Sequence, residues 1–316
     1  MIDFNKKIND VVTVAVITYH SAATVLETLD SILTQSYDSK NIELIISDDG
    51  SKDNTVQMIV NWLSQHQASF YCVRFFANQV NGGISKNCNV AWKAATSKWI
   101  KTIAGDDLLC NTCIEENMLF INNRPDVEVL FSKMNHFKDG SLDVVVDVTP
   151  HKEKISLFEL SADEQFRALI KMSFNVAPTS FIKKEILQSV GFCCEEYFYI
   201  EDLPLWLKMT RYGHKLCFMD KVTVYYRLSD SLSNSLSRLI NINFIEQVHL
   251  VHKKEIWPYL RMHEKWRVYD KYVEYYSWLV PYKIFNNKRN IVSLSLHYII
   301  SCFRPTSLSK IINRFK

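Results

Sequence analysis

Residues 11–55 read V-V-T-V-A-V-I-T-Y-H-S-A-A-T-V-L-E-T-L-D-S-I-L-T-Q-S-Y-D-S-K-N-I-E-L-I-I-S-D-D-G-S-K-D-N-T, and this stretch decides the fold. Residues 11–17 and 42–47 are continuous apolar runs rich in β-branched side chains. Such runs are typical of strands that are buried on both faces of a parallel sheet. Between them, apolar residues recur at helical spacing at Val25, Leu26, Leu29, Ile32 and Leu33. The stretch therefore predicts a β-α-β unit.

The same alternation continues along the chain. Residues 56–64 have the pattern of a helix, and residues 70–76 and 99–103 have that of strands. Alternating strands and helices predict an α/β fold with a mostly parallel central sheet flanked by helices. Ligands of such sheets bind at the carboxyl ends of the strands. We therefore expect the loops at 18–21, 48–53 and 105–108 to converge on one crevice.

Length and composition set the broader limits. The 316 residues suffice for one large domain and a smaller one, and 47% hydrophobic against 22% charged residues favours a packed core. We expect an N-terminal extension at 1–10, a catalytic α/β domain at 11–230 and a helical, aromatic and basic region at 231–316. A net charge of +3 gives no reason to expect a nucleic-acid partner. The first strand is not followed by a G-x-G-x-x-G or Walker sequence, which disfavours a dehydrogenase or an NTPase.

The end of the chain has an unusual charge pattern. Residues 281–316 contain neither Asp nor Glu, and their basic residues are Lys283, Lys288, Arg289, Arg304, Lys310, Arg314 and Lys316. Such a segment suits an anionic membrane surface, although a helix packed on the catalytic domain with a solvated basic face fits equally well. Signal-peptide and membrane-span patterns are absent. We expect a cytoplasmic protein that contacts the inner face of the cell membrane peripherally, with reduced cysteines.

Two consecutive carboxylates follow the strand at 99–103. Residues 98–109 read K-W-I-K-T-I-A-G-D-D-L-L and place Asp106 and Asp107 at its carboxyl end. Paired carboxylates suit Mg²⁺ or Mn²⁺ bound to a diphosphate. The alternative is a cap for the following helix.

Two further loops carry polar side chains. In D-D-G-S, residues 48–51, a carboxylate of Asp48 or Asp49 is placed to bind a nucleobase; the alternative is a turn. In N-G-G-I-S-K-N-C-N, residues 81–89, the glycine pair allows close backbone approach and Lys86 is placed to offset phosphate charge. The alternative is an ordinary loop that opens a helix.

A second acidic pair lies later in the chain. Residues 199–206 read Y-I-E-D-L-P-L-W, and Glu201 and Asp202 precede a helical run. An acid here suits a general base that accepts the proton of an acceptor hydroxyl. The alternative is helix capping.

Taken together, these segments resemble a family 2 glycosyltransferase. The resemblance covers about residues 11–235 in collinear order and includes D-D-G-S, N-G-G-I-S-K-N-C-N, A-G-D-D, N-V-A-P-T-S-F-I-K-K-E and Y-I-E-D-L-P-L-W. It implies the GT-A fold, inverting sugar transfer and a divalent cation. The roles that it implies are nucleotide contact by Thr18 and Tyr19, base contact by Asp49 beside Asp48, a ribose or metal contact by Asp106, metal binding by Asp107, and base catalysis by Asp202 with Glu201 as its rival.

The sequence departs from the family pattern at two places. Gly105 stands where a third acid is sometimes present, and Tyr226-Arg227-Leu228 is not followed by the histidine that often comes next. Arg227 either helps to hold the donor or pairs within the fold.

The resemblance also indicates substrates. It implies a nucleotide-sugar donor, with a UDP-sugar favoured, and a glycan acceptor such as an undecaprenyl-diphosphate-linked O-antigen or other surface polysaccharide. Two other functions are a sugar nucleotidyltransferase and an inactive sugar-binding module. The first is disfavoured because no Gly- and Arg-rich loop follows the first strand, and the second because the acids are present.

Overall fold

The computed structural model describes residues 10–138, 144–228 and 239–308. The chain divides into two compact units, Met1–Leu228 and Ser229–Lys316. Most of the expected N-terminal extension and the basic residues Lys310, Arg314 and Lys316 lie outside the described residues.

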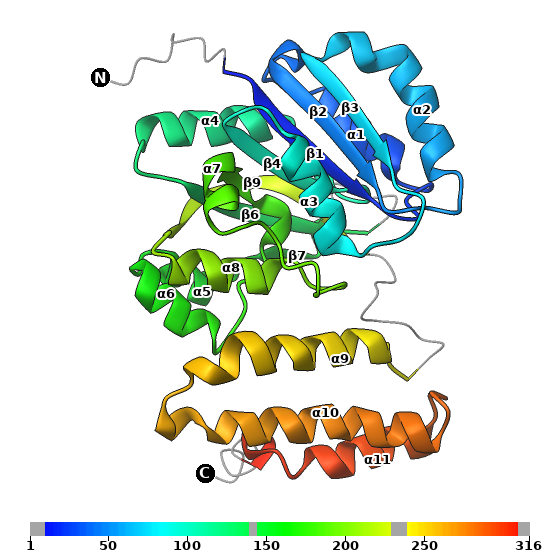
Figure 1. Cartoon of the computed structure of the whole chain (residues 1–316), viewed down its shortest axis with the longest axis vertical. Helices are drawn as coiled ribbons and strands as arrows, with labels where there is room; N and C mark the ends of the chain where they lie inside the picture. The colour runs from blue at the N-terminus through cyan, green and yellow to red at the C-terminus, as the bar shows by residue number, and fades with distance from the viewer. Residues whose placement is uncertain (1–9, 139–143, 229–238, 309–316) are drawn as a thin grey trace. The chain divides into compact units, whose positions relative to one another are not determined.

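The first unit is built around one sheet with helices on its faces (Figure 1). In the described residues the sheet has nine strands in the order β3-β2-β1-β4-β8-β6-β9-β5, with β7 paired to β6. The strands are β1 (Val12–Thr18), β2 (Ile42–Asp48), β3 (Cys72–Ala77), β4 (Trp99–Ala104), β5 (Leu108–Leu109), β6 (Val129–Phe137), β7 (Asp147–Thr149), β8 (Phe181–Lys183) and β9 (Leu216–Arg227). The helices are α1 (Val25–Leu33), α2 (Thr55–His66), α3 (Ile84–Ala94), α4 (Cys113–Asn123), α5 (Lys152–Ile155), α6 (Ala162–Leu169), α7 (Lys184–Ser189) and α8 (Asp202–Arg211).

The expected α/β fold is confirmed, and the strand directions refine it. Strands β3, β2, β1 and β4 are parallel, as the apolar runs predicted. Strand β8 is antiparallel to both β4 and β6, and β9 is parallel to β6. The sheet is therefore parallel in its first half and mixed in its second.

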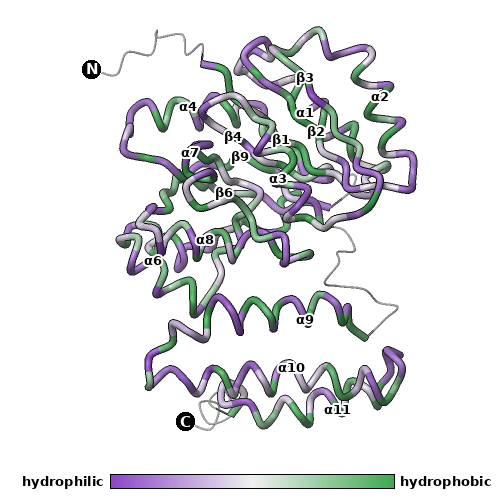
Figure 2. Tube along the Cα trace, viewed as in Figure 1, coloured by the Kyte–Doolittle hydropathy of each residue, from purple (hydrophilic) through white to green (hydrophobic). Residues whose placement is uncertain are grey.

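The core lies along the parallel half of the sheet. Every residue of β1 and of β2 is buried, and hydrophobic colour predominates along β1 in Figure 2. Val14 and Leu44 are neighbours in register, and both pack in the same core as Leu29 of α1. Burying an aliphatic side chain of this size contributes about 1.5–3 kcal/mol to stability. This packing fixes the positions of the strand ends.

The second unit is helical, as expected. Its helices are α9 (Ile242–Val251), α10 (Trp266–Ile284) and α11 (Ile291–Ser301). The rings of Trp278 on α10 and His297 on α11 stack with centroids 3.5 Å apart. Arg304 binds Asp270 at 3.0 Å and Glu274 at 2.9 Å. Within the residues described, none of the helices has both the length and the apolar character needed to cross a membrane.

Candidate active site

Three loops meet at the carboxyl ends of β1, β2 and β4. The register pairs Thr18 with Asp48 and Ile17 with Ala104. The Asp49 amide donates to the Thr18 carbonyl at 2.9 Å, and the Gly105 amide donates to the Ile17 carbonyl at 2.9 Å. A Cβ on Gly105 would lie 2.7 Å from Cγ2 of Thr18, closer than real contacts allow. The structure thus brings the three predicted loops together.

Asp48 stabilises the turn after β2. Its buried carboxylate accepts hydrogen bonds from the hydroxyl of Thr18 (3.0 Å) and from the amide (2.8 Å) and hydroxyl (2.6 Å) of Ser51. These bonds are those of a side chain that shapes a loop. Tyr19, which is 45% exposed, is the predicted nucleotide contact that faces solvent.

Asp49 joins this turn to the start of α3. Its two carboxylate oxygens accept hydrogen bonds from the amides of Gly82 (2.8 Å) and Gly83 (2.9 Å). Burial raises the pKa of Asp49, against the opposing effects of these two bonds and of Lys86. Lys86 itself is exposed and lies close enough to act on this carboxylate.

Helix α3 connects the nucleotide-side loops to the segment before α8. The Ile84 amide donates to the Phe198 carbonyl at 2.9 Å, and the Ser85 hydroxyl donates to the Tyr197 carbonyl at 2.6 Å. At the other face, the Asn87 side-chain amide donates to the Ser47 carbonyl at 3.0 Å. The segment 81–89 therefore holds two parts of the site at a fixed separation.

Glu201 and Asp202 form an acidic pair at the start of α8. Both are partly buried, and the Leu203 amide donates to Oδ1 of Asp202 at 2.6 Å. Burial and the neighbouring Asp202 raise the pKa of Glu201 to about 8, and burial raises the pKa of Asp202. Since two adjacent charges are unfavourable, the two acids resist being ionised together.

Helix α1 and strand β9 hold the G-D-D loop. The hydroxyls of Thr24 and Thr28 donate to the carbonyls of Gly105 and Asp107, each at 2.8 Å. Asp107 is only 2% exposed, and its Oδ1 accepts the Arg227 amide at 2.9 Å. The loop is thus fixed from two elements that are distant in the chain.

The electrostatics of this loop favour a cation. Burial and the neighbouring Asp106 raise the pKa of Asp107 well above its usual value, and burial raises the pKa of Asp106. The fully buried Lys101 on β4 and Arg227 oppose this shift at Asp107. A divalent cation would stabilise the ionised form of two neighbouring carboxylates that resist being ionised together.

Arg227 is engaged within the fold. Its side chain is 4% exposed and its Nε donates to the Asp106 carbonyl at 2.8 Å. Its Nη2 pairs with Glu27 of α1 at 2.5 Å, and its guanidinium lies 4.7 Å from the ring centroid of Phe137. Of the two alternatives for Arg227, these contacts match pairing within the fold.

Two side chains indicate which acids lie near one another. After burial, the charges of Glu201 and Asp49 raise the pKa of the Cys88 thiol on α3. After burial, Asp107, Asp106 and Glu201 all raise the pKa of Tyr226. Glu201 therefore lies within electrostatic range of one side chain that Asp49 also affects and of another that Asp106 and Asp107 also affect.

The described residues contain no group of three or more His, Cys, Asp and Glu side chains arranged to hold a metal ion. At the G-D-D loop the protein offers the two carboxylates of Asp106 and Asp107. Their hard oxygens match Mg²⁺ and Mn²⁺, which commonly take their remaining ligands from water and a substrate diphosphate. The residues present fit a cation that is shared with a substrate.

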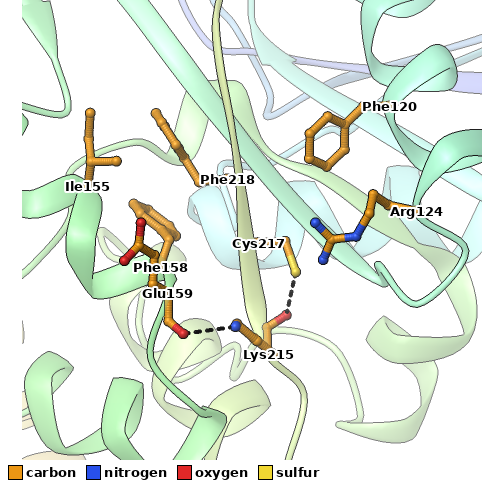
Figure 3. A pocket seen from close by; sticks show the side chains of 8 residues that line it. All are labelled: Phe120, Arg124, Ile155, Phe158, Glu159, Lys215, Cys217 and Phe218. Carbon is orange, nitrogen blue, oxygen red and sulfur yellow. Dashed lines mark hydrogen bonds between the residues drawn. The ribbon is translucent and has the colours of Figure 1, made fainter.

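A separate cavity of about 200 Å³ contains none of the predicted site residues. Figure 3 shows that it is lined by Phe120, Arg124, Ile155, Phe158, Glu159, Lys215, Cys217 and Phe218. Lys215 and Cys217 lie just before and at the start of β9, whereas Arg227 ends that strand. This volume is below the usual size of ligand pockets. The cavity therefore lies apart from the acidic region.

Several residues of the site were not identified from sequence. Lys101 is a charged residue within an apolar strand, and this pattern could have indicated that its side chain has a role in the site. Asn87 and Asn89 lie in the quoted N-C-N, but their partners are remote: Asn89 exchanges hydrogen bonds with the Cys193 backbone at 2.9 and 3.0 Å. Tyr226 gave no signal beyond its place beside Arg227.

Comparison with known proteins agrees with this geometry. The family model for glycosyl transferase family 2 matches residues 13–191, which are more than half of the chain. The Escherichia coli protein WfaP, a UDP-Glc:alpha-D-GlcNAc-diphosphoundecaprenol beta-1,3-glucosyltransferase, is 26% identical over 219 residues, which are 69% of this chain and 78% of WfaP.

Two solved structures share the fold. The crystal structure of S. aureus TarS 1–349 in complex with UDP-GlcNAc is 21% identical with a TM-score of 0.59 and covers 84% of this chain and 72% of that one. The mannosyltransferase PcManGT from Pyrobaculum calidifontis, in complex with GDP-Man and Mn²⁺, is 15% identical with a TM-score of 0.52 and covers 92% and 69%.

The fold and the acidic site define a glycosyltransferase of the GT-A type. The chain belongs to glycosyl transferase family 2.

Proposed function

We propose that this protein is a metal-dependent, inverting glycosyltransferase that moves a sugar from a UDP-sugar to a hydroxyl group of a lipid-linked glycan. The observation that carries the proposal is that the D-D-G-S and G-D-D loops both bond to the end of β1, while the start of α3 bonds both to Asp49 and to the backbone shortly before the E-D pair. A donor diphosphate and an acceptor hydroxyl need such groups within one region.

The catalytic base in this proposal is Asp202. It takes the proton of the acceptor hydroxyl, whose oxygen attacks the anomeric carbon on the face opposite the nucleotide. One displacement with one base inverts the configuration. Glu201 is protonated at neutral pH because its pKa is raised to about 8. In that state Glu201 can donate a hydrogen bond, and the proposal assigns the role of base to the Asp202 carboxylate.

Asp107 and Asp106 are the proposed ligands of Mn²⁺ or Mg²⁺. When bound there, the cation supplies Lewis-acid stabilisation of the departing diphosphate. The raised pKa values of both carboxylates support this role, and so does the Mn²⁺ in the complex of the mannosyltransferase PcManGT.

The proposed donor and acceptor are supported by the similar proteins. The TarS complexes contain UDP-GlcNAc or UDP, and the name of WfaP specifies a UDP-Glc donor and a diphosphoundecaprenol acceptor. We assign the base contact to Asp49 and the other nucleotide contacts to Thr18, Tyr19, Asp48, Lys86 and Asp106. An undecaprenyl-diphosphate-linked acceptor would place the reaction at the inner face of the cell membrane.

The proposal is tested with a panel of nucleotide-sugars, by measuring release of nucleoside diphosphate with and without Mn²⁺. We expect metal-dependent release from a UDP-sugar and its loss in Asp202→Asn. Donor binding without release in the presence of every acceptor tested would instead identify a binding module. Release of pyrophosphate from a nucleoside triphosphate and a sugar phosphate would identify a nucleotidyltransferase.

A further inference from the structure

Helix α11 exposes an apolar face on the second unit. Four side chains of the helix and Phe303, two residues beyond its end, are 60–83% exposed, and we call these five the α11 stripe: Ile291, Val292, Tyr298, Ile299 and Phe303. Offsets of one, seven and eight residues from Ile291 place the four helical members on one side of α11. A soluble surface seldom gathers so many large apolar side chains, and such a patch marks an interaction site.

The stripe is held in place from the opposite face of α11. Ser293 is buried and donates to the Lys288 carbonyl at 2.9 Å, and His297 stacks on Trp278 of α10. After the helix, Arg304 is anchored to Asp270 at 3.0 Å. These contacts fix the rotation of α11, so the stripe is presented as one surface.

The charged residues that flank α11 in sequence are basic. Lys283 and Lys288 are exposed and precede α11, and residues 281–316 contain no acid. An apolar face with an aromatic ring and flanking lysines has the composition of a helix that lies in the headgroup region of an anionic bilayer. Each lysine near such a surface adds attraction to acidic lipids.

A second copy of the chain is a poorer occupant. If two α11 helices paired in parallel through their stripes, Lys283 and Lys288 would lie opposite their copies, and residues 281–316 contain no acid to offset them. Like charges across an interface oppose association. An anionic bilayer supplies the missing negative charge and the apolar environment at once.

We propose that the α11 stripe, with Lys283 and Lys288, docks this protein on an anionic lipid bilayer. The proposed function enters only as the reason for docking: on the membrane, the transferase would meet its lipid-linked acceptor. Binding to vesicles is measured without donor or acceptor, so the two proposals fail separately.

The experiment is vesicle flotation of the full chain, with phosphatidylglycerol–phosphatidylethanolamine vesicles against phosphatidylcholine vesicles. We expect partition to the anionic vesicles, about tenfold lower in the double variant Ile291→Ser, Ile299→Ser. Lys288→Gln should lower it about fivefold on anionic vesicles alone. Val292→Ser tests a stripe residue, and Val144→Ser in the first unit is its control, because Val292 is 62% and Val144 60% exposed. Only Val292→Ser should weaken binding to the vesicles.

Two results would overturn the proposal. One is equal flotation of the wild type and the double variant, or no flotation of either. The other is a dimer in light scattering that the double variant abolishes while vesicle binding is absent, which would assign the stripe to a second copy. Circular dichroism of each variant and its donor hydrolysis in vesicle-free solution separate these results from misfolding and from failure of the catalytic proposal.

Discussion

The backbone amide of Arg227 donates a hydrogen bond to Oδ1 of Asp107 at 2.9 Å, across 120 residues of sequence. This bond joins the end of β9 to the G-D-D loop, and the Arg227 side chain adds a second bond to the Asp106 carbonyl. The position of the proposed metal ligand therefore depends on a strand that enters the sheet late in the chain.

Arg227→Lys should weaken this attachment. Lysine cannot reproduce the planar fork that reaches both the Asp106 carbonyl and Glu27. We expect a loss of about 1–3 kcal/mol in the free energy of unfolding and a higher metal concentration for half-maximal activity. Denaturant unfolding and metal titration measure the two effects, with Arg211→Lys as the control on an exposed arginine. Unchanged metal dependence in a stable variant would contradict the positioning role.

Gly105→Ala should separate the loops. The added Cβ would lie 2.7 Å from Cγ2 of Thr18, so one of the two loops must move. We expect a loss of about 1–3 kcal/mol in stability and reduced donor binding. Thr18→Ser removes that methyl group and keeps the hydroxyl that binds Asp48. The double variant should therefore recover part of both losses in thermal unfolding and donor titration; purely additive losses would show that this contact is not the cause.

Asp202→Asn should lower transfer by about 10²–10⁴-fold, the usual contribution of a general base. Glu201→Gln is the matched comparison, because a side chain that is already neutral at pH 7 loses no charge on this change. We expect Glu201→Gln to keep most of the rate at pH 7. If instead Glu201→Gln lost the activity and Asp202→Asn kept it, the roles of the two acids would be reversed.

The pair also predicts a pH dependence of stability. The pKa of Glu201 is raised from 4.5 to about 8 in the folded state, so the folded protein holds this proton over a range where the unfolded chain releases it. Stability should therefore fall as the pH rises from 4.5 to 8 and then level off. Glu201→Gln should reduce this fall, with little effect below pH 4.5. Thermal unfolding of both proteins between pH 4 and 9 checks this, and parallel curves would contradict the shift.

Metal binding should strengthen as the pH rises. The pKa values of Asp106 and Asp107 are raised by burial, and at Asp107 by the neighbouring Asp106 as well, so protons compete with the cation. Asp107→Asn should weaken Mn²⁺-dependent binding of UDP while leaving metal-free binding largely unchanged. Calorimetry with and without Mn²⁺ measures both. Equal loss with and without the metal would indicate a damaged fold.

Local pattern predicted the first half of the sheet. The apolar runs at 11–17, 42–47 and 99–103 correspond to β1, β2 and β4, because continuous β-branched runs are favourable only in buried strands. Strand β9 has no such run: L-C-F-M-D-K-V-T-V-Y-Y-R mixes charged and apolar residues. Its place between β6 and β5 is set by pairing with remote segments, which a local pattern does not encode.

The site shows the same division. The acids were recognisable because each pair follows a strand or precedes a helix, where side chains reach the edge of the sheet. Their partners were not recognisable. The hydrogen bonds from the Gly82 and Gly83 amides to Asp49, and the burial of Lys101 within electrostatic range of Asp107, depend on the assembled sheet. The assigned roles of the acids in catalysis stay predictions until the variants are measured.

Helix α3 has a consequence for attempts to change substrate specificity. Its first turn bonds to the Tyr197–Phe198 backbone through Ile84 and Ser85, and Asn89 bonds to the Cys193 backbone about one turn later. Inserting or deleting a residue between Ser85 and Asn89 would rotate one group of contacts by about 100° relative to the other. Directed evolution for new donors or acceptors should therefore accept point substitutions in this helix and reject changes of its length.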